Sequence, residues 1–228
     1  MCGRARLSSN VSEIKQVFGI SPDRPTPNFP PNWNVAPAAS LPVVRFDAEA
    51  GQRSLDMLRW GLIPHWAKDI KIGYSTINAR AEDIDTKPAF RAAFRQRRCL
   101  VPVDSFYEWK KTPTGKRPYA IGIKGGRLMA LAGLWENWRS PEGEYIRSFT
   151  IATTKPNALC AELHNRMPVV LQPDAWPVWL GEEPAEPKDL KALLAPYPGD
   201  DMICWPVNAR VGNVKHNDAA LIEPISLP

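Results

Sequence analysis

The sequence is poor in cysteine and histidine, and it contains no long hydrophobic run. Its three histidines are not spaced as metal ligands are, so we expect no metal site and no cofactor. No segment is apolar enough to cross a bilayer and no signal peptide is visible, so we expect a cytoplasmic protein without a membrane partner. The four cysteines form no CxxC pair and are expected to stay reduced: Cys2, Cys99, Cys160 and Cys204.

A strong charge of one sign is also absent. The net charge of +5 permits a polyanionic partner but does not require one. Proline and tryptophan, by contrast, are abundant, with 24 and nine residues. So many prolines favour short strands and turns over long helices. Nine tryptophans exceed what one core usually needs, so we expect some of them in a groove.

Hydrophobic patterning predicts an α+β fold with a curved antiparallel β-sheet, a barrel-like core and short peripheral helices. Because no repeat or long linker divides the chain, we expect one domain over residues 1–228. Strands are expected at residues 41–46, 55–60, 99–103, 106–110, 119–123, 128–135, 145–154 and 202–207. Helices are expected from Ser9 or Asn10 to Phe18, from residue 77 and from Pro88 onward, and at residues 157–164, 174–180 and 187–194.

The first four residues, MCGR, place a cysteine directly after the initiator methionine. If Met1 is removed, Cys2 carries a thiol and a free α-amine on adjacent carbons. Such an amine titrates near about 7.7–8.0 and an ordinary thiol near about 8.5. Gly3 leaves room for a reacting partner, and Arg4 adds a permanent positive charge. Taken alone, these four residues favour the alternative that Cys2 is an incidental residue on a frayed terminus.

Three further positions have side chains suited to proton transfer or ligand orientation. Glu108 stands between aromatic residues in FYEWK, where strand alternation would separate it from its neighbours Tyr107 and Trp109. A carboxylate flanked by aromatic rings suits proton shuttling, although a surface glutamate paired with a lysine would look the same. His164 follows an expected helix, where it is either a proton donor or a cation on the helix dipole.

Asn78 and Arg80 lie two residues apart in NARAE. Pointing into a cleft, the amide would orient a ligand and the guanidinium would hold a phosphate. The alternative is a capping network with a solvated arginine. Other arginines and tryptophans would suit single-stranded nucleic acid, because aromatic rings stack on bases while cations follow phosphates. A core tryptophan set with a solvated basic surface is the competing interpretation of Arg4, Trp66, Arg80, Trp109 and Arg166.

Together, these segments resemble the SOS response-associated peptidase (SRAP) family. The resemblance runs in order from residue 2 to about residue 225, and each motif is weak by itself. The motifs are MCGR (1–4), NVAP (34–37), WGLIP (60–64), INARAE (77–82), RCLVP (98–102), FYEW (106–109), HNRMP (164–168) and VGNVK (211–215).

The resemblance implies a monomeric sensor and shield of abasic sites in single-stranded DNA, associated with the nucleoid when it acts. In that family the exposed N-terminal cysteine forms a covalent crosslink with the ring-opened sugar aldehyde. The resemblance makes Cys2 the nucleophile, completed by Asn78, Glu108 and His164. It implies DNA contacts by Arg4, Asn34, Trp66, Arg80, Trp109 and Arg166. A second tryptophan common in the family is Ala67 here, which puts one stacking contact in doubt.

The functional groups predict a thiazolidine product, since the amine can form an iminium that the neighbouring thiol closes into a five-membered ring. Two other classes remain open. One is a cysteine hydrolase that uses Cys2, Glu108 and His164, and the family name, which records a peptidase proposal, fits removal of Met1 by the protein itself. The other is a non-catalytic module that binds single-stranded DNA.

Overall fold

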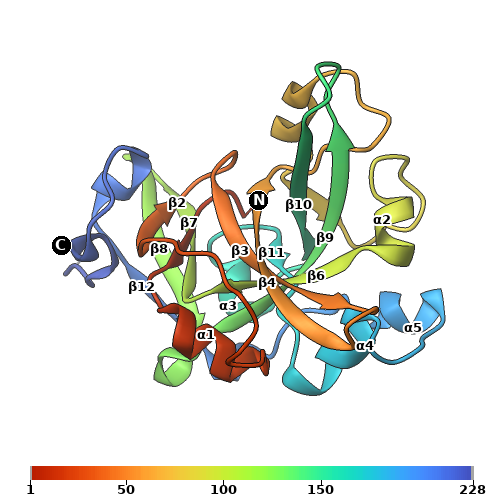
Figure 1. The fold of residues 1–228 in the computed structure, drawn as a ribbon. Helices are drawn as coiled ribbons and strands as arrows, with labels where there is room; N and C mark the ends of the chain where they lie inside the picture. Colours follow the sequence, from red (N-terminus) through yellow and green to blue (C-terminus); the bar gives the residue numbers. More distant parts are fainter. Residues whose placement is uncertain (1, 227–228) are drawn as a thin grey trace.

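Apolar residues at alternate positions build a closed β-barrel in the computed structural model, which describes residues 2–226 (Figure 1). Five strands pair in the order β10-β4-β3-β6-β9, and β9 pairs again with β10 to close the ring. Most pairings are antiparallel, but β10 runs parallel to β4 and to β5. The strands are β3 (Ser40–Asp47), β4 (Gln52–Trp60), β5 (Asn78–Arg80), β6 (Arg98–Val103), β9 (Met129–Arg139), β10 (Tyr145–Thr154) and β11 (Met167–Pro168).

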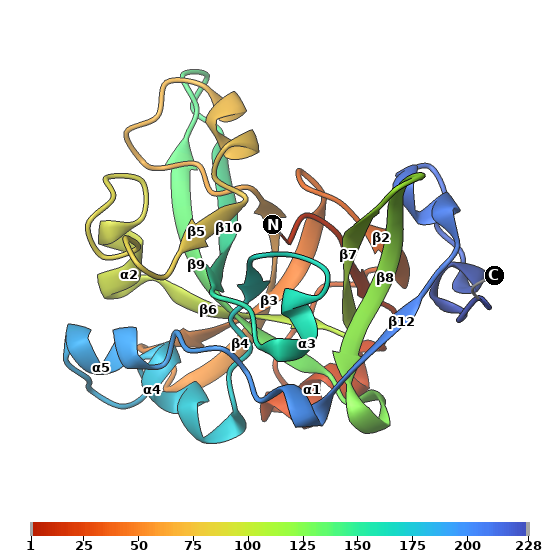
Figure 2. The same ribbon diagram turned by 180° about the vertical axis from the view of Figure 1, so that it is seen from behind.

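A second sheet packs against the barrel. Its five strands pair in the order β12-β8-β7-β1-β2. Its buried residues share one apolar cluster with those of the barrel, so the two sheets have a common core. Figure 2 shows the N-terminal segment between two upright hairpins, β9–β10 and β7–β8. The strands of this sheet are β1 (Ala5–Leu7), β2 (Asn32–Val35), β7 (Ser105–Thr112), β8 (Gly115–Ile123) and β12 (Met202–Pro206). The predicted α+β class and barrel-like core are confirmed.

Short helices cover the barrel at the end away from the two hairpins. Helix α1 starts where the Asn10 side chain accepts a hydrogen bond from Glu13 N, and it ends at Gly19 in the left-handed region. Its buried Phe18 stacks on Trp176 with ring centroids 4.8 Å apart. The α-helices are α1 (Val11–Phe18), α2 (Arg91–Gln96), α3 (Ala158–Ala161), α4 (Trp176–Leu180) and α5 (Pro187–Ala192). Within residues 2–226, no helix has the length and apolar character needed to span a membrane.

The helix expected from residue 77 is wrong, because residues 78–80 form strand β5 instead. Their backbone pairs with β10, Ala79 opposite Ala152 and Arg80 opposite Thr153. Ala79 is fully buried, whereas Asn78 is only partly buried and Arg80 is exposed. Strand alternation thus points Asn78 and Arg80 to the same side, away from the core. Pairing with a barrel strand has overridden the helical propensity of the alanine-containing NARAE segment.

Candidate active site

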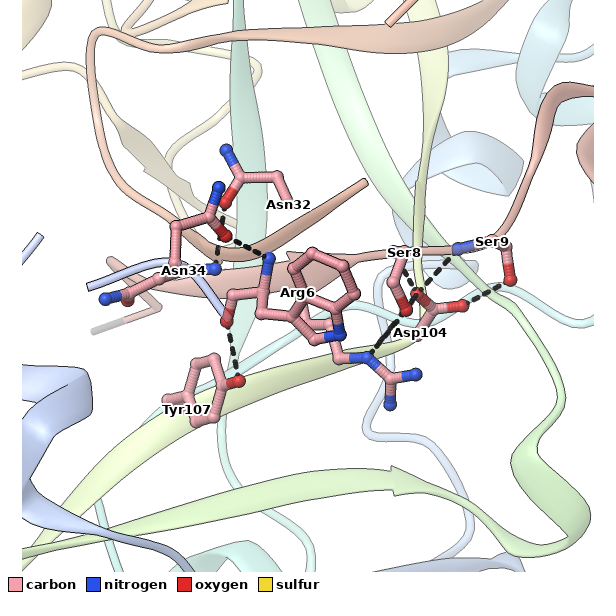
Figure 3. A network of polar contacts seen from close by, with 9 residues as sticks. Arg6, Ser8, Ser9, Asn32, Asn34, Asp104 and Tyr107 are labelled. Carbon is pink, nitrogen blue, oxygen red and sulfur yellow. Dashed lines mark hydrogen bonds and ion pairs between the residues drawn. The ribbon is translucent and has the colours of Figure 1, made fainter. Parts of the chain in front are cut away.

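A hydrogen-bond network fixes strand β1, which begins at Ala5, three residues after Cys2 (Figure 3). At the corner between β6 and β7, the Asp104 carboxylate accepts bonds from the backbone and side chain of both Ser8 and Ser9, at 2.5–3.2 Å. Farther along, Tyr107 N donates to Arg4 O at 2.9 Å. The chain leading back to Cys2 is therefore held beside β7 along its whole length.

Arg4 and Asn34 tie this strand to the C-terminal segment. Arg4 Nη1 donates to Asn34 Oδ1 at 2.7 Å and to the Val211 carbonyl at 2.6 Å. The Asn34 amide donates to two more carbonyls of the C-terminal segment, at 2.8 and 3.0 Å, and only 4% of Asn34 is exposed. Both side chains are thus engaged within the protein, and their predicted contact with DNA stays a prediction. Arg4 also lies 5.9 Å from the ring centroid of Trp109.

The Cys2 side chain is fully buried in the core shared by the two sheets. Burial raises the pKa of its thiol, and the nearby negative charge of Glu108 raises it further. Apolar side chains of both sheets pack around the thiol, and the exposure of Cys2 as an N-terminal residue after loss of Met1 stays a prediction. The predicted removal of Met1 concerns a residue outside the described range.

Glu108 lies on β7, beside the segment that carries Cys2, and is 5% exposed. The predicted alternation along β7 is confirmed: Phe106 belongs to the same cluster as Cys2, whereas Tyr107 and Trp109 pack in a separate cluster on the other face. The alternative of a surface glutamate paired with Lys110 is wrong, because Glu108 is buried and Lys110 pairs with Glu162 instead.

A groove of about 930 Å³ brings Glu108 and His164 together. One wall is the β7–β8 hairpin, and the other is the segment that joins α3 to β11. The residues lining the groove are Glu108, Trp109, Lys110, Lys111, Lys116, Glu162, Leu163, His164, Asn165 and Gly212. The carboxylate and the imidazole therefore line one groove, and the Cys2 thiol is buried close enough to Glu108 for the carboxylate charge to act on it.

His164 is oriented by the backbone of its own loop. Helix α3 ends at Ala161, earlier than expected, and the chain then turns. The Arg166 backbone N–H donates to His164 Nδ1 at 3.0 Å. The Arg166 carbonyl lies 3.3 Å from the same nitrogen, and in the tautomer with the proton on Nε2 the Nδ1 atom accepts the shorter bond, from Arg166 N. His164 can thus offer an N–H donor at Nε2.

Arg80, Arg166 and Asn78 meet along β10. Arg166 donates to both carboxylate oxygens of Glu82, at 2.5 and 2.9 Å, and to the Thr153 carbonyl at 2.5 Å. These hydrogen bonds lower the pKa of Glu82. Arg80 is exposed, and within residues 2–226 its side chain donates no hydrogen bond. Asn78 Oδ1 is buried and accepts no hydrogen bond from the described residues, so it can receive one from a ligand.

The two predicted stacking residues differ in their surroundings. Trp109 lines the groove, whereas Trp66 lies on the loop after β4 and is 50% exposed. The remaining cysteines are core residues, as expected for Cys99 and Cys160, which are buried, while Cys204 is only partly so. Among residues 2–226, no three histidine, cysteine, aspartate or glutamate side chains are grouped so that they could hold a metal ion.

Sequence reasoning missed the residues that surround these groups. Nothing in the sequence placed the lysines of residues 110–116 in the same groove as Glu108. The counter-charge Glu82 lies inside the INARAE segment, and Glu162 lies two residues before the HNRMP segment. Asp104 had no sequence signal beyond its position between two predicted strands.

The fold is a closed barrel with an added sheet, and its groove is lined by a buried carboxylate and an imidazole. The chain belongs to the SOS response associated peptidase (SRAP) family, whose profile matches residues 1–214. The resemblance found in the sequence is therefore confirmed.

Relatives from distant organisms match this chain over nearly its whole length. The chain is 44% identical to the abasic site processing protein YoqW of Bacillus subtilis, over 98% of this chain and 99% of that protein. It is 30% identical to the abasic site processing protein HMCES of Xenopus tropicalis, over 100% of this chain and 79% of that protein. A crystal structure of a Bacteroides thetaiotaomicron protein has the same fold, with a TM-score of 0.88, 24% identity and coverage of 99% of this chain and 100% of that one.

Proposed function

We propose that this protein processes abasic sites in single-stranded DNA by forming a thiazolidine crosslink between Cys2 and the ring-opened sugar. The observation that carries the proposal is the position of Cys2, second in the chain and held by β1 beside the groove carboxylate Glu108. The names of the bacterial and vertebrate relatives support abasic-site processing. The crosslink chemistry is our inference from the functional groups.

The reaction needs both nucleophiles of an N-terminal cysteine. After Met1 is removed, the α-amine attacks the aldehyde carbon and water leaves, which gives an iminium. The Cys2 sulfur then bonds to the same carbon, and its proton is lost to a base while the nitrogen takes up the electron pair of the C=N bond. Ring closure is intramolecular and therefore favoured by a high effective concentration. It also removes the electron sink that would otherwise promote β-elimination of the 3′ phosphate and cut the strand.

Glu108 and His164 are the proton-transfer groups in this scheme. Glu108 accepts a proton from the α-ammonium before the neutral amine attacks, or from the thiol during ring closure, and the Nε2–H of His164 protonates the departing hydroxyl. Asn78 Oδ1, which accepts no bond within residues 2–226, would receive one from a sugar hydroxyl. Because burial keeps the Cys2 thiol protonated, the carboxylate beside it is the base most directly placed to activate it.

DNA contacts divide between the groove and the surface beyond it. Trp109 in the groove and Trp66 outside it would stack on bases. Arg80 is exposed and would meet a phosphate without first breaking a hydrogen bond to residues 2–226. Arg4, Asn34 and Arg166 already bond within the chain, so any contact of theirs with DNA would use their remaining donors. We propose that a single copy of the chain suffices.

A denaturing gel and an intact-mass measurement with an oligonucleotide that contains one abasic site test this proposal. The wild type should give a heat-stable adduct equal in mass to protein without Met1 plus DNA minus one water. Cys2→Ala keeps the amine, so it should give only a labile or strand-cutting adduct that borohydride traps. An uncleaved residue before Cys2 should prevent both adducts, because the cysteine nitrogen is then an amide.

Cys204→Ser is the matched control, because this thiol is partly buried on β12 and should not affect the adduct. A heat-stable crosslink from Cys2→Ala without borohydride would overturn the thiazolidine. Multiple turnover of a peptide substrate that lacks an aldehyde would instead support the cysteine hydrolase, for which the same Cys2, Glu108 and His164 are available.

A further inference from the structure

We propose that the outer half of the β7–β8 hairpin binds the phosphate backbone of the DNA strand, and that Glu162 competes with the DNA for Lys110. This proposal rests on the proposed function for the identity of the ligand. The lysines concerned are Lys110, Lys111 and Lys116, which line one wall of the groove. None of them belongs to the set of contacts that the sequence resemblance implied.

The hairpin carries like charges directly opposite one another. Its register pairs Lys110 with Arg117 and Lys111 with Lys116. Directly opposed like charges destabilise an antiparallel pair, so this arrangement costs the isolated protein free energy. Residues 105–123 contain one acidic residue, Glu108, which is buried at the base of the hairpin. The charges at the outer end are therefore not balanced by the hairpin itself.

Neighbouring strands do not shield these charges either. β1 pairs with β7 at Ser105 and Phe106, and β12 pairs with β8 from Tyr119 onward. Within residues 2–226, residues 110–117 thus have no strand partner except one another. The outer half of the hairpin projects beside the groove, as Figure 2 shows for β7 and β8. A charged edge can also protect a sheet from aggregation, but that role would not require the lysines to line the groove that contains Glu108.

Among residues 2–226, Glu162 is the only carboxylate that lines the opposite wall of the groove. Its Oε2 lies 3.4 Å from Lys110 Nζ, so the ion pair bridges the two walls of the groove. Both side chains are largely exposed, 71% for Glu162 and 41% for Lys110, and such a pair contributes little to stability. A DNA phosphate that follows the groove would meet Lys110 at this point and displace the carboxylate.

Trp109 connects this surface to the reacting residues. It lines the same groove and precedes Lys110 on β7. An aromatic face next to a row of cations is the combination that binds single strands without sequence preference. A DNA strand that follows the groove would therefore contact the hairpin lysines first, then Trp109, and then reach Glu108 and His164.

Equilibrium binding to an undamaged thymidine oligonucleotide tests the surface, because this probe has no aldehyde and forms no crosslink. In fluorescence anisotropy, Lys111→Gln with Lys116→Gln should weaken binding about five- to tenfold at physiological salt. The slope of log K against log salt should fall by about 1.4, since each lost phosphate contact on a single strand contributes about 0.7. Glu162→Gln should tighten binding about two- to threefold.

The matched controls are Lys188→Gln and Glu183→Gln, two exposed residues outside the groove, which should change binding less than 1.5-fold. Unchanged affinity and slope for the lysine double variant would overturn the proposal. So would an acidic peptide that binds as tightly as the oligonucleotide at the same salt, or weaker binding by Glu162→Gln. If the wild type forms no adduct with abasic DNA but these binding changes occur, the proposed function fails while the phosphate-binding surface stands.

Discussion

The two ends of strand β7 differ in how their charged side chains are paired. At its start, the Asp104 carboxylate accepts four hydrogen bonds from Ser8 and Ser9 and lies 3.8 Å from Arg6. At its far end, Lys110 and Lys111 face Arg117 and Lys116 across the hairpin. The Asp104 network satisfies its own polar groups and therefore fixes the position of β1. The opposed like charges of the hairpin, by contrast, would be stabilised by an anion from outside the hairpin.

Glu108 lies on β7 between these two ends, so both ends bear on the same part of the groove. The internally bonded end fixes β1, and with it the Cys2 segment, against the base of the groove. The charged end would bring an anionic strand to the same place. We therefore expect substitutions at the first end to act on stability and on the placement of Cys2, and substitutions at the second end to act on binding.

The largest effect is expected at the internally bonded end. Asp104→Ala leaves the backbone N–H groups of Ser8 and Ser9 without their acceptor in a partly buried site, which should lower the free energy of unfolding by about 3 kcal/mol. Urea denaturation followed by tryptophan fluorescence measures this loss. Asp200→Ala, at an exposed aspartate, should stay within about 0.5 kcal/mol of wild type. Equal stability of the two variants would remove Asp104 from the anchoring role.

Most strands of the fold could be predicted from the sequence, because their alternation and turn residues act locally. The pair β3–β4 and the alternation along β7 both follow from local pattern. Residues 78–80 could not be predicted in the same way, since their strand exists only through pairing with β10, which is distant in sequence. Barrel closure by β9 and β10 likewise depends on long-range pairing.

For the candidate site, the sequence identified the residues but not their burial or their hydrogen-bond partners. Recognisable motifs pointed to Glu108 and His164, and the groove brings them together. The burial of Cys2 was not foreseen, because a terminal residue is usually frayed and nothing local shows that two sheets close over it. The internal bonds of Arg4 and Asn34 also escaped notice, since their partners lie near the other end of the chain.

A second, smaller effect is expected from alkaline pH, and it concerns the buried thiols of the shared core. Burial raises the pKa of Cys160 from its ordinary value of 9.0 to about 12. As the pH rises, the thiol therefore ionises in the unfolded chain before it does so in the folded protein. Its contribution to the free energy of unfolding is fully present below about pH 9 and is lost as the pH rises toward 12. The loss approaches about 1.4 kcal/mol per pH unit for one thiol.

Denaturation of wild type and Cys160→Ala at pH 8, 9 and 10 measures this effect. The substitution lowers stability at every pH, but the stability of the variant should fall less steeply above pH 9. Parallel curves for the two proteins would contradict the buried, protonated thiol. Lysines, with an ordinary pKa of about 10.4, begin to lose charge near pH 10, but they do so in both proteins, so the difference between the two curves reports the thiol.

The smallest expected effect separates two arginines of the β5–β11 region. Arg80 is exposed, whereas Arg166 is held by Glu82 and the Thr153 carbonyl. Arg80→Ala should weaken binding to an undamaged single-stranded oligonucleotide about threefold, or about 0.7 kcal/mol, and lower the salt slope by about 0.7. Its unfolding free energy should not change, because Arg80 donates no hydrogen bond within residues 2–226. Arg80→Lys keeps the charge and should restore the salt slope.

Arg166→Ala should instead lower stability, since it leaves a buried carbonyl and Glu82 without their donor. If Arg80→Ala destabilises the fold as much as Arg166→Ala does, Arg80 is a structural residue and the surface it occupies is not a DNA contact.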